Sequence, residues 1–149
     1  MLKESLVEIF ERDLLKLKEE INLYHNENNL WVLKNQVSNS AGNLCLHLTG
    51  NMNHFVGAIL GKTGFVRERD QEFSSKNIPR KQMIDELDKT IAIVVKTLKN
   101  LSEEDLKKNF PIPKHDRVVS MDYMLLHLLT HLNYHLGQVN YHRRLLEGI

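Results

Sequence analysis

Apolar side chains recur at intervals of three and four residues in four separate stretches of this sequence, and this periodicity constrains the fold more than any other feature. The stretches run from Leu2 to about Tyr24, from Ser40 to about Leu60, from Pro79 to about Asn100, and from Ser120 to the end of the sequence. Four helices with one apolar stripe each bury those stripes by packing on one another. We therefore predict an all-α protein, an antiparallel four-helix bundle, with residues 1–149 in a single domain.

Residues that start and end helices separate the four stretches. The side chains of residues 38–40 can each accept a hydrogen bond from the first free N–H groups of the second helix, and Gly61 is suited to end that helix. The residues from Arg67 to Pro79 are predicted to form a polar connection. Ser102, followed at the capping-box position by Asp105, predicts a short additional helical turn before the last helix.

The charge balance and the single cysteine limit the classes of partner and the compartment. Lys and Arg total 20 against 19 Asp and Glu, which gives a formal net charge of +1. Such a chain has no strong field to attract a phosphate backbone or an anionic membrane, so we expect neither nucleic acid nor a membrane as partner. The longest aliphatic run, Ile91–Val95, is too short to span a bilayer. Cys45 alone permits no intrachain disulfide, which fits a reducing compartment, and we expect a cytoplasmic protein.

Eight histidines are present, and two of them stand four residues apart in the last predicted helix. Residues at this spacing lie about 5–6 Å apart on one helix face, so His131 and His135 can bind one ion together. Transition ions such as Zn²⁺ bind neutral imidazole nitrogens, and catalytic sites commonly have three protein ligands. His47 is the best candidate for the third ligand, because it lies near the middle of the second predicted helix among apolar side chains and a buried histidine needs a polar partner.

Other interpretations of these histidines are open. Pairs at this spacing also arise by chance, and each ring can instead hydrogen-bond a buried carbonyl group. The zincin protease signature is absent, because Leu132 stands where that motif has a glutamate. His127 extends the same helix face, but three successive turns drift too far for three rings to meet one ion. His54 lies about 10 Å along the helix from His47, and Cys45 lies about 200° around it, so neither is expected to bind that ion.

Two segments resemble the DinB-like (DinB/YfiT-like) superfamily of metal-binding four-helix bundles. They are residues 43–51, NLCLHLTGN, and residues 131–138, HLNYHLGQ. A third segment, GFVRERDQEF at residues 64–73, is similar to a subgroup of that superfamily with no characterised function. The resemblance covers essentially the whole chain. Members of the superfamily usually have arginine where this sequence has Leu136, which argues against a polar role at that position and leaves the histidines intact.

The resemblance implies a divalent ion held by His47, His131 and His135. Characterised branches of the superfamily include thiol-dependent S-transferases and a thiol-dependent isomerase, so a low-molecular-weight thiol is the implied cosubstrate. The expected function is therefore that of a divalent-metal-dependent transferase or hydrolase acting on a small-molecule substrate, in which a thiol bound to the ion reacts as the thiolate. Three imidazoles accept several ions, and the sequence leaves Zn²⁺, Ni²⁺, Fe²⁺ and Mn²⁺ all open.

Three further side chains are candidates for positioning a water molecule or a substrate. Gln138 lies three residues after His135, and Asn51 lies one turn after His47. Arg69 lies in the polar connection, where a guanidinium can bind a carboxylate through two hydrogen bonds. For that connection we prefer the alternative of a solvated loop with local ion pairs. Residue 137, a glycine, is expected to permit close packing of the last helix.

Two other functions are open at this point. One is a non-catalytic metal-binding or stress-associated protein, and the other is a purely structural bundle whose histidines are satisfied within the core. An enzyme is favoured because the sequence offers no obvious fourth ligand, whereas closed structural sites usually have four. A homodimer is expected through apolar side chains near the ends of the first and last helices, namely Leu2, Tyr141, Leu145 and Leu146.

Overall fold

Five α-helices and three segments of 3-10 or π helix make up the structure, a computed structural model that describes residues 1–148. The α-helices are α1 (Leu2–Leu23), α2 (Ala41–Met52), α3 (Arg69–Ser74), α4 (Arg80–Lys99) and α5 (Met121–Glu147). The 3-10 segments are η1 (Glu27–Trp31) and η3 (Asp105–Lys107), and the π-helical segment is η2 (Asn53–Leu60). These residues contain no strand, so the all-α prediction is confirmed. None of the described helices is both long and apolar enough to cross a membrane.

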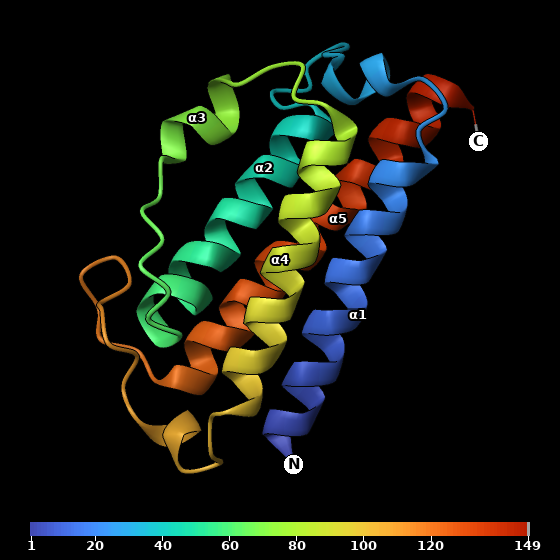
Figure 1. The fold of residues 1–149 in the computed structure, drawn as a ribbon. Coiled ribbons are helices and arrows are strands. Elements are labelled where there is room, and N and C mark those ends of the chain that lie inside the picture. Colours follow the sequence, from blue (N-terminus) through green and yellow to red (C-terminus); the bar gives the residue numbers. More distant parts are fainter. Residues whose placement is uncertain (149) are drawn as a thin grey trace.

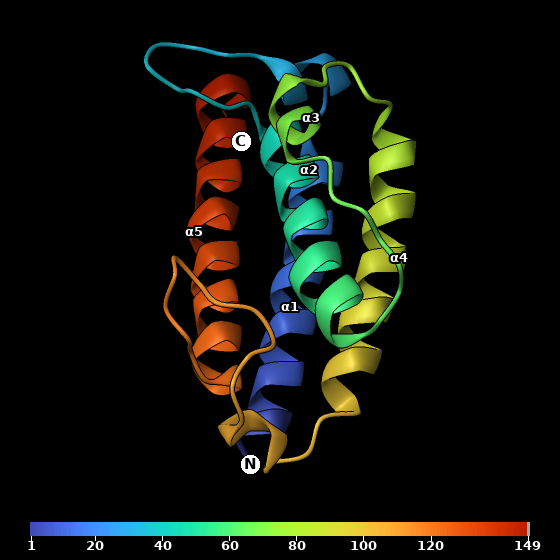
Figure 2. The same ribbon diagram turned by 90° about the vertical axis from the view of Figure 1, so that its left-hand side faces the viewer.

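The four longer α-helices, α1, α2, α4 and α5, lie side by side (Figure 1, Figure 2). Both α1 and α2 contact α4 and α5. Helices α1 and α5 run in one direction, and α2 and α4 run in the opposite direction (Figure 1). Segment 61–79, which contains α3, returns along the molecule, so α4 begins at the same end as α2. As a result α2 lies beside α5 with the opposite direction, and these two helices contain the histidines of interest.

The core forms where the apolar stripes of these helices meet. Phe10, Leu14, Leu17 and Ile21 of α1 are fully buried, as the helical period of the first stretch predicts. Full burial of such side chains stabilises a fold by about 1.5–3 kcal/mol each. The stripe of α5 is buried as well, at Met121, Leu125, Leu128, Leu132 and Val139. Packing of this stripe fixes which face of α5 is turned toward α2.

The predicted helix caps are present. Ser40 Oγ accepts a hydrogen bond from the N–H of Asn43 at 3.2 Å and starts α2. Ser120 caps α5 in the same way. Ser102 and Asp105 form a reciprocal capping box, in which the N–H of Asp105 donates to Ser102 Oγ at 3.0 Å and the N–H of Ser102 donates to Asp105 Oδ2 at 2.8 Å. The short helical turn expected there is therefore confirmed as η3.

The connection between the second and third predicted helices differs from the expectation. Within the range Arg67–Pro79, residues Arg69–Ser74 form α3, which packs against α2. The second helix also changes its hydrogen bonding, because α2 ends at Met52 and continues to Leu60 as the π-helical segment η2. A helix as short as α3, with only 6 residues, gives too few turns for its period to be visible in the sequence.

Two buried polar networks connect the ends of α1 and α5. Tyr24 Oη lies 2.6 Å from His142 Nδ1, and His142 Nε2 lies 2.8 Å from the carbonyl oxygen of Val32. Arg143 Nε donates to Glu20 Oε2 at 2.8 Å, and Glu20 is only 2% exposed. His142 therefore has both ring nitrogens satisfied within the core, and its role is structural.

Candidate metal centre

His47 of α2 and His131 and His135 of α5 come together where these two helices contact each other. One ligand nitrogen from each residue lies within 4.8 Å of those from the other two. The ring centroids are 5.0 Å apart for His47 and His131, 5.3 Å for His47 and His135, and 4.6 Å for His131 and His135. His47 is buried and the other two rings are half-buried. We call this group the three-histidine cluster.

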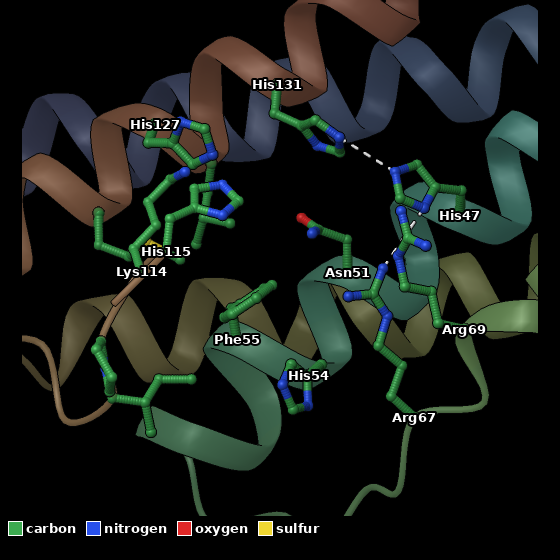
Figure 3. Close-up of a pocket in the computed structure, with 14 residues that line it drawn as sticks. His47, Asn51, His54, Phe55, Arg67, Arg69, Lys114, His115, His127 and His131 are labelled. Carbon is green, nitrogen blue, oxygen red and sulfur yellow. Dashed lines mark hydrogen bonds between the residues drawn. The ribbon is translucent and has the colours of Figure 1, made fainter. Parts of the chain in front are cut away.

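The distance between the Nε2 atoms of His47 and His131 is close to that expected for two ligands of one ion. His47 Nε2 lies 3.1 Å from His131 Nε2 (Figure 3). Two nitrogens that each bind a tetrahedral ion at about 2.0–2.1 Å lie about 3.3 Å from each other. The two rings therefore stand at nearly the separation that a shared ion requires.

His131 is not satisfied in the way that a structural core histidine would be. Its Nδ1 is buried and has no hydrogen-bond partner among residues 1–148, and its Nε2 faces another imidazole nitrogen. Burial, and then the neighbouring rings of His135 and His47, lower the pKa of His131 to about 4. Burial also lowers the pKa of His135. Both rings are therefore neutral at pH 7, which is the form that binds a metal ion.

Gln138 orients His135. Its Oε1 lies 2.7 Å from His135 Nδ1. Because an amide oxygen can only accept a hydrogen bond, Nδ1 has the proton and Nε2 keeps its lone pair. Nε2 is then the nitrogen of His135 that is available to an ion. Gln138 therefore contacts a histidine of the cluster, whereas the sequence analysis predicted that it positions a water molecule or a substrate.

Glu72, which the sequence analysis did not single out, orients His47. Its Oε1 lies 2.9 Å from His47 Nδ1, which leaves His47 Nε2 directed at His131. Arg67 donates from Nε to Glu72 Oε2 and from Nη2 to Glu72 Oε1, both at 2.9 Å. Burial raises the pKa of Glu72, but hydrogen bonds from His47 and Arg67 outweigh burial, and the net pKa is lowered. Glu72 is therefore a carboxylate at neutral pH, and a carboxylate behind a metal-binding imidazole fixes the ring and raises its basicity.

The close fit of α3 against α2 places Glu72 behind His47. A Cβ atom at Gly50 would overlap the Glu72 carboxylate, so glycine is required there for the side chain to lie across α2. Asn43 Nδ2 donates to the backbone oxygens of Glu72 and Ser75, at 3.0 and 2.8 Å. In the sequence Glu72 looks like its charged neighbours, and no spacing rule connects it to His47. The glycine in the middle of a helix is the one signal of a close approach that the sequence offered.

A cavity of about 390 Å³, here called the first cavity, opens beside His47 and His131 (Figure 3). Its volume falls in the range of small-molecule sites. His135 and Gln138 line a second cavity of about 600 Å³. The three-histidine cluster therefore borders two cavities that can admit a small molecule.

Asn51 and Arg69, both predicted from the sequence as positioning residues, line the first cavity. Asn51 is 7% exposed, and its Oδ1 is buried with no hydrogen-bond partner in the described chain. Arg69 is exposed, and its guanidinium lies 5.2 Å from the centroid of the Phe73 ring. The half-buried Arg67 also lines the cavity, and its pair with Glu72 is one of the local ion pairs expected for this segment. The expectation of a solvated loop is wrong, because Glu72 is buried and residues Arg69–Ser74 are helical.

The other candidates lie outside the three-histidine cluster. The ring of His127 stacks with that of His131 at a centroid distance of 6.5 Å, and His54 lies in the wall of the first cavity. Cys45 is buried, and burial raises the pKa of its thiol to about 12, so the thiol is inert at neutral pH. The close packing predicted for Gly137 is wrong, since a Cβ atom there would meet no atom within 4 Å.

Comparison with known proteins places the chain in a family. A search of curated proteins gave no match. The family described as "Protein of unknown function (DUF1572)" matches residues 4–148. This range contains the three-histidine cluster together with Glu72 and Gln138. The chain therefore belongs to the DUF1572 family of proteins of unknown function.

Proposed function

We propose that this protein is a divalent-metal-dependent enzyme of the DinB-like superfamily that acts on a small molecule. His47, His131 and His135 would hold the ion, and the four long helices, two in each direction, would be the four-helix bundle of that superfamily. The observation behind the proposal is the convergence of three imidazole nitrogens within 4.8 Å of one another beside a cavity of about 390 Å³.

The donor set fits a catalytic ion better than a structural one. Within residues 1–148, no fourth His, Cys, Asp or Glu joins the cluster. Structural zinc sites usually have four protein ligands, whereas catalytic sites have three and keep a position open for water or substrate. Imidazole ligands favour transition ions such as Zn²⁺, Ni²⁺ and Fe²⁺.

The residues around the cluster have separate roles in this proposal. A bound ion would lower the pKa of a coordinated water or thiol and so supply a nucleophile near neutral pH. Glu72 and Gln138 accept hydrogen bonds from Nδ1 of His47 and His135, which leaves the Nε2 lone pairs free. The amide oxygen of Asn51, which has no hydrogen-bond partner among residues 1–148, would bind a molecule in the first cavity.

A thiol nucleophile, as used by characterised DinB-like enzymes, would have to come from outside the chain. Cys45 is the only cysteine, and it is buried with a pKa raised by burial to about 12. A low-molecular-weight thiol can instead approach through either cavity beside the cluster. We therefore propose thiol-dependent S-transfer as the first reaction to test and hydrolysis as the second.

Turnover by the metal-loaded protein tests this function. Metal-free protein is reconstituted in turn with Zn²⁺, Ni²⁺, Fe²⁺ and Mn²⁺ and assayed with a panel of low-molecular-weight thiols and electrophilic acceptors, and with esters and amides. We expect metal-dependent turnover that is lost in His131→Ala and retained in His25→Ala, an exposed histidine at the end of α1. Full metal content without turnover in any combination would contradict the enzyme and favour a non-catalytic metal-binding protein.

The homodimer is also a proposal. Tyr134, Tyr141 and Leu145 are 66%, 64% and 73% exposed and lie at helical spacing along one side of α5. A second copy of the chain would cover this apolar stripe. Light scattering on the eluting protein is expected to give twice the mass of one chain, and a value of 17.4 kDa would contradict the dimer.

A further inference from the structure

The first cavity is lined by basic side chains and, within the described chain, by no Asp or Glu. Beyond the three-histidine cluster, its basic and imidazole side chains are His54, Arg67, Arg69, Lys114, His115 and His127. A cavity lined by one sign of charge concentrates ligands of the opposite sign. The lining therefore favours an anionic ligand over a neutral or cationic one.

Lys114 and Arg69 are the cations of this lining that have no acidic partner among residues 1–148, and Lys114 is the more buried of the two. Arg67 is paired with Glu72 at 2.9 Å, and Arg69 lies over the ring of Phe73. The side chain of Lys114 is half-buried, and its ammonium group has no hydrogen bond or ion pair with any residue of the range 1–148. Partial burial of an ammonium without a partner costs free energy, which a bound anion would offset.

The backbone holds Lys114 in place at the cavity. Its N–H donates to the carbonyl oxygen of Arg117 at 2.8 Å, and the N–H of Arg117 donates back to the carbonyl oxygen of Lys114 at 2.9 Å. The two residues between them, His115 and Asp116, have φ angles of 48° and 60°, as in a tight two-residue turn. The hydrogen-bonded turn therefore fixes the backbone of Lys114, and the side chain of Lys114 lies close to His127 and His115 (Figure 3).

Asn51 marks the opposite part of the same cavity. Its side chain projects into the space between His131 and the arginines (Figure 3), and it is more than nine-tenths buried, with no partner for Oδ1 among residues 1–148. A buried amide oxygen without a hydrogen bond destabilises the protein unless a ligand or a water molecule satisfies it. This is a second, independent indication that the cavity is built to hold a polar molecule.

Between these polar groups the wall is apolar. Phe55, Ile112, Met124 and Leu128 line the cavity together with the basic side chains. An inorganic anion would leave this surface without contact, whereas an organic anion would cover it.

We propose that the first cavity binds a small organic carboxylate, with its acidic group on Lys114 and its apolar body against Phe55 and Leu128. The opposite end of the molecule would lie near Asn51 and the three-histidine cluster. The carboxylate would be the substrate class of the proposed enzyme, and that part of the proposal rests on the proposed function. The ion pair with Lys114 is the element of the proposal that can be tested alone.

The test uses metal-free full-length protein, so that a bound ion cannot attract the carboxylate. The probes are butyrate, hexanoate and phenylacetate, each paired with its neutral amide, and binding is measured by ligand-observed NMR titration. We expect at least one carboxylate to bind about tenfold more tightly than its amide. Lys114→Gln is expected to abolish this preference, and Lys107→Gln, an exposed lysine in the same connecting segment, is expected to retain it.

Three results would overturn the proposal: no binding of any carboxylate, equal binding of acid and amide, or a preference that survives Lys114→Gln. Circular dichroism confirms that each variant is folded. The metal content of Lys114→Gln, measured in parallel, is expected to equal that of the wild type. If the wild type binds no metal ion, the proposed enzyme is contradicted, but the carboxylate result is unaffected. Failure of the proposed function can therefore be distinguished from failure of the carboxylate proposal.

Discussion

Replacing Glu72 by Gln is the sharpest perturbation of the candidate site that leaves all three proposed ligands in place. The substitution keeps the shape of the side chain and removes its charge. It changes the bond between Oε1 and His47 Nδ1, at 2.9 Å, and the two bonds from Arg67, also at 2.9 Å. Glu72 is 7% exposed, so water does not replace the lost interactions.

The magnitude follows from these contacts. A hydrogen bond to a charged group contributes about 1.5–3 kcal/mol, and removal of a carboxylate behind a metal-binding imidazole lowers metal affinity about 10–100-fold. The two figures agree, since a tenfold change equals about 1.4 kcal/mol. We expect the upper part of this range, because Glu72→Gln also leaves the half-buried Arg67 without its counter-charge.

Competition with a chromophoric chelator measures the affinity for Zn²⁺ in the wild type and in Glu72→Gln. The matched control is Glu68→Gln, an exposed carboxylate four residues earlier that is not among the possible metal ligands found in residues 1–148. Circular dichroism and urea unfolding exclude loss of the fold as the cause. If Glu72→Gln binds Zn²⁺ within about twofold of the wild type, the role assigned to Glu72 is refuted.

Three further predictions concern the same structure. Gly50→Ala should weaken Zn²⁺ binding as Glu72→Gln does, because the added Cβ displaces the Glu72 carboxylate. This effect is expected although alanine stabilises a helix by about 1 kcal/mol relative to glycine. An unchanged affinity for Zn²⁺ would contradict the prediction. The pKa of His131 is about 4 in the folded protein and 6.5 for the free side chain. As the pH falls, the unfolded chain therefore binds a proton at this residue before the folded protein does. The free energy of unfolding of the metal-free protein should decrease between about pH 6.5 and pH 4. Urea unfolding at pH 7 and at pH 5 measures this decrease. The free energy of unfolding should decrease less in His131→Asn than in the wild type, and an equal decrease would contradict the lowered pKa of His131. Glu20→Ala should reduce the free energy of unfolding by about 3–5 kcal/mol, because it removes the buried carboxylate that pairs with Arg143, and a loss below about 1 kcal/mol would show that this pair is not important for stability.

Much of the helical architecture was accessible from the sequence because it depends on local rules. The apolar period determined where α1, α4 and α5 lie to within one or two residues, and serine side chains marked where α2 and α5 begin. The relative directions of the helices were not accessible in this way. They depend on the path of segment 61–79, whose length and polarity do not specify that it returns along the molecule before α4 begins.

The candidate site was predictable only for the residues that α2 and α5 contribute. His131 and His135 share a face through their spacing, and His47 was a candidate through its apolar surroundings, so all three were found. Glu72 was missed because its partner is distant in sequence and its neighbours are charged and solvated. The contact between Glu72 and His47 depends on tertiary packing across Gly50, and the spacing of apolar residues in the sequence does not predict such packing.

Metal content is the measurement that tests the central claim most directly. Untagged protein is purified without chelator, loaded in separate samples with Zn²⁺, Ni²⁺ or Mn²⁺, freed of excess ion and measured by elemental mass spectrometry. Single alanine variants of the cluster histidines and of His127 are treated in the same way. We predict about one ion per chain in the wild type and in His127→Ala, and loss of the ion in His47→Ala, His131→Ala and His135→Ala. A wild type that binds no Zn²⁺, Ni²⁺ or Mn²⁺, or cluster variants that keep a full ion, would contradict the account.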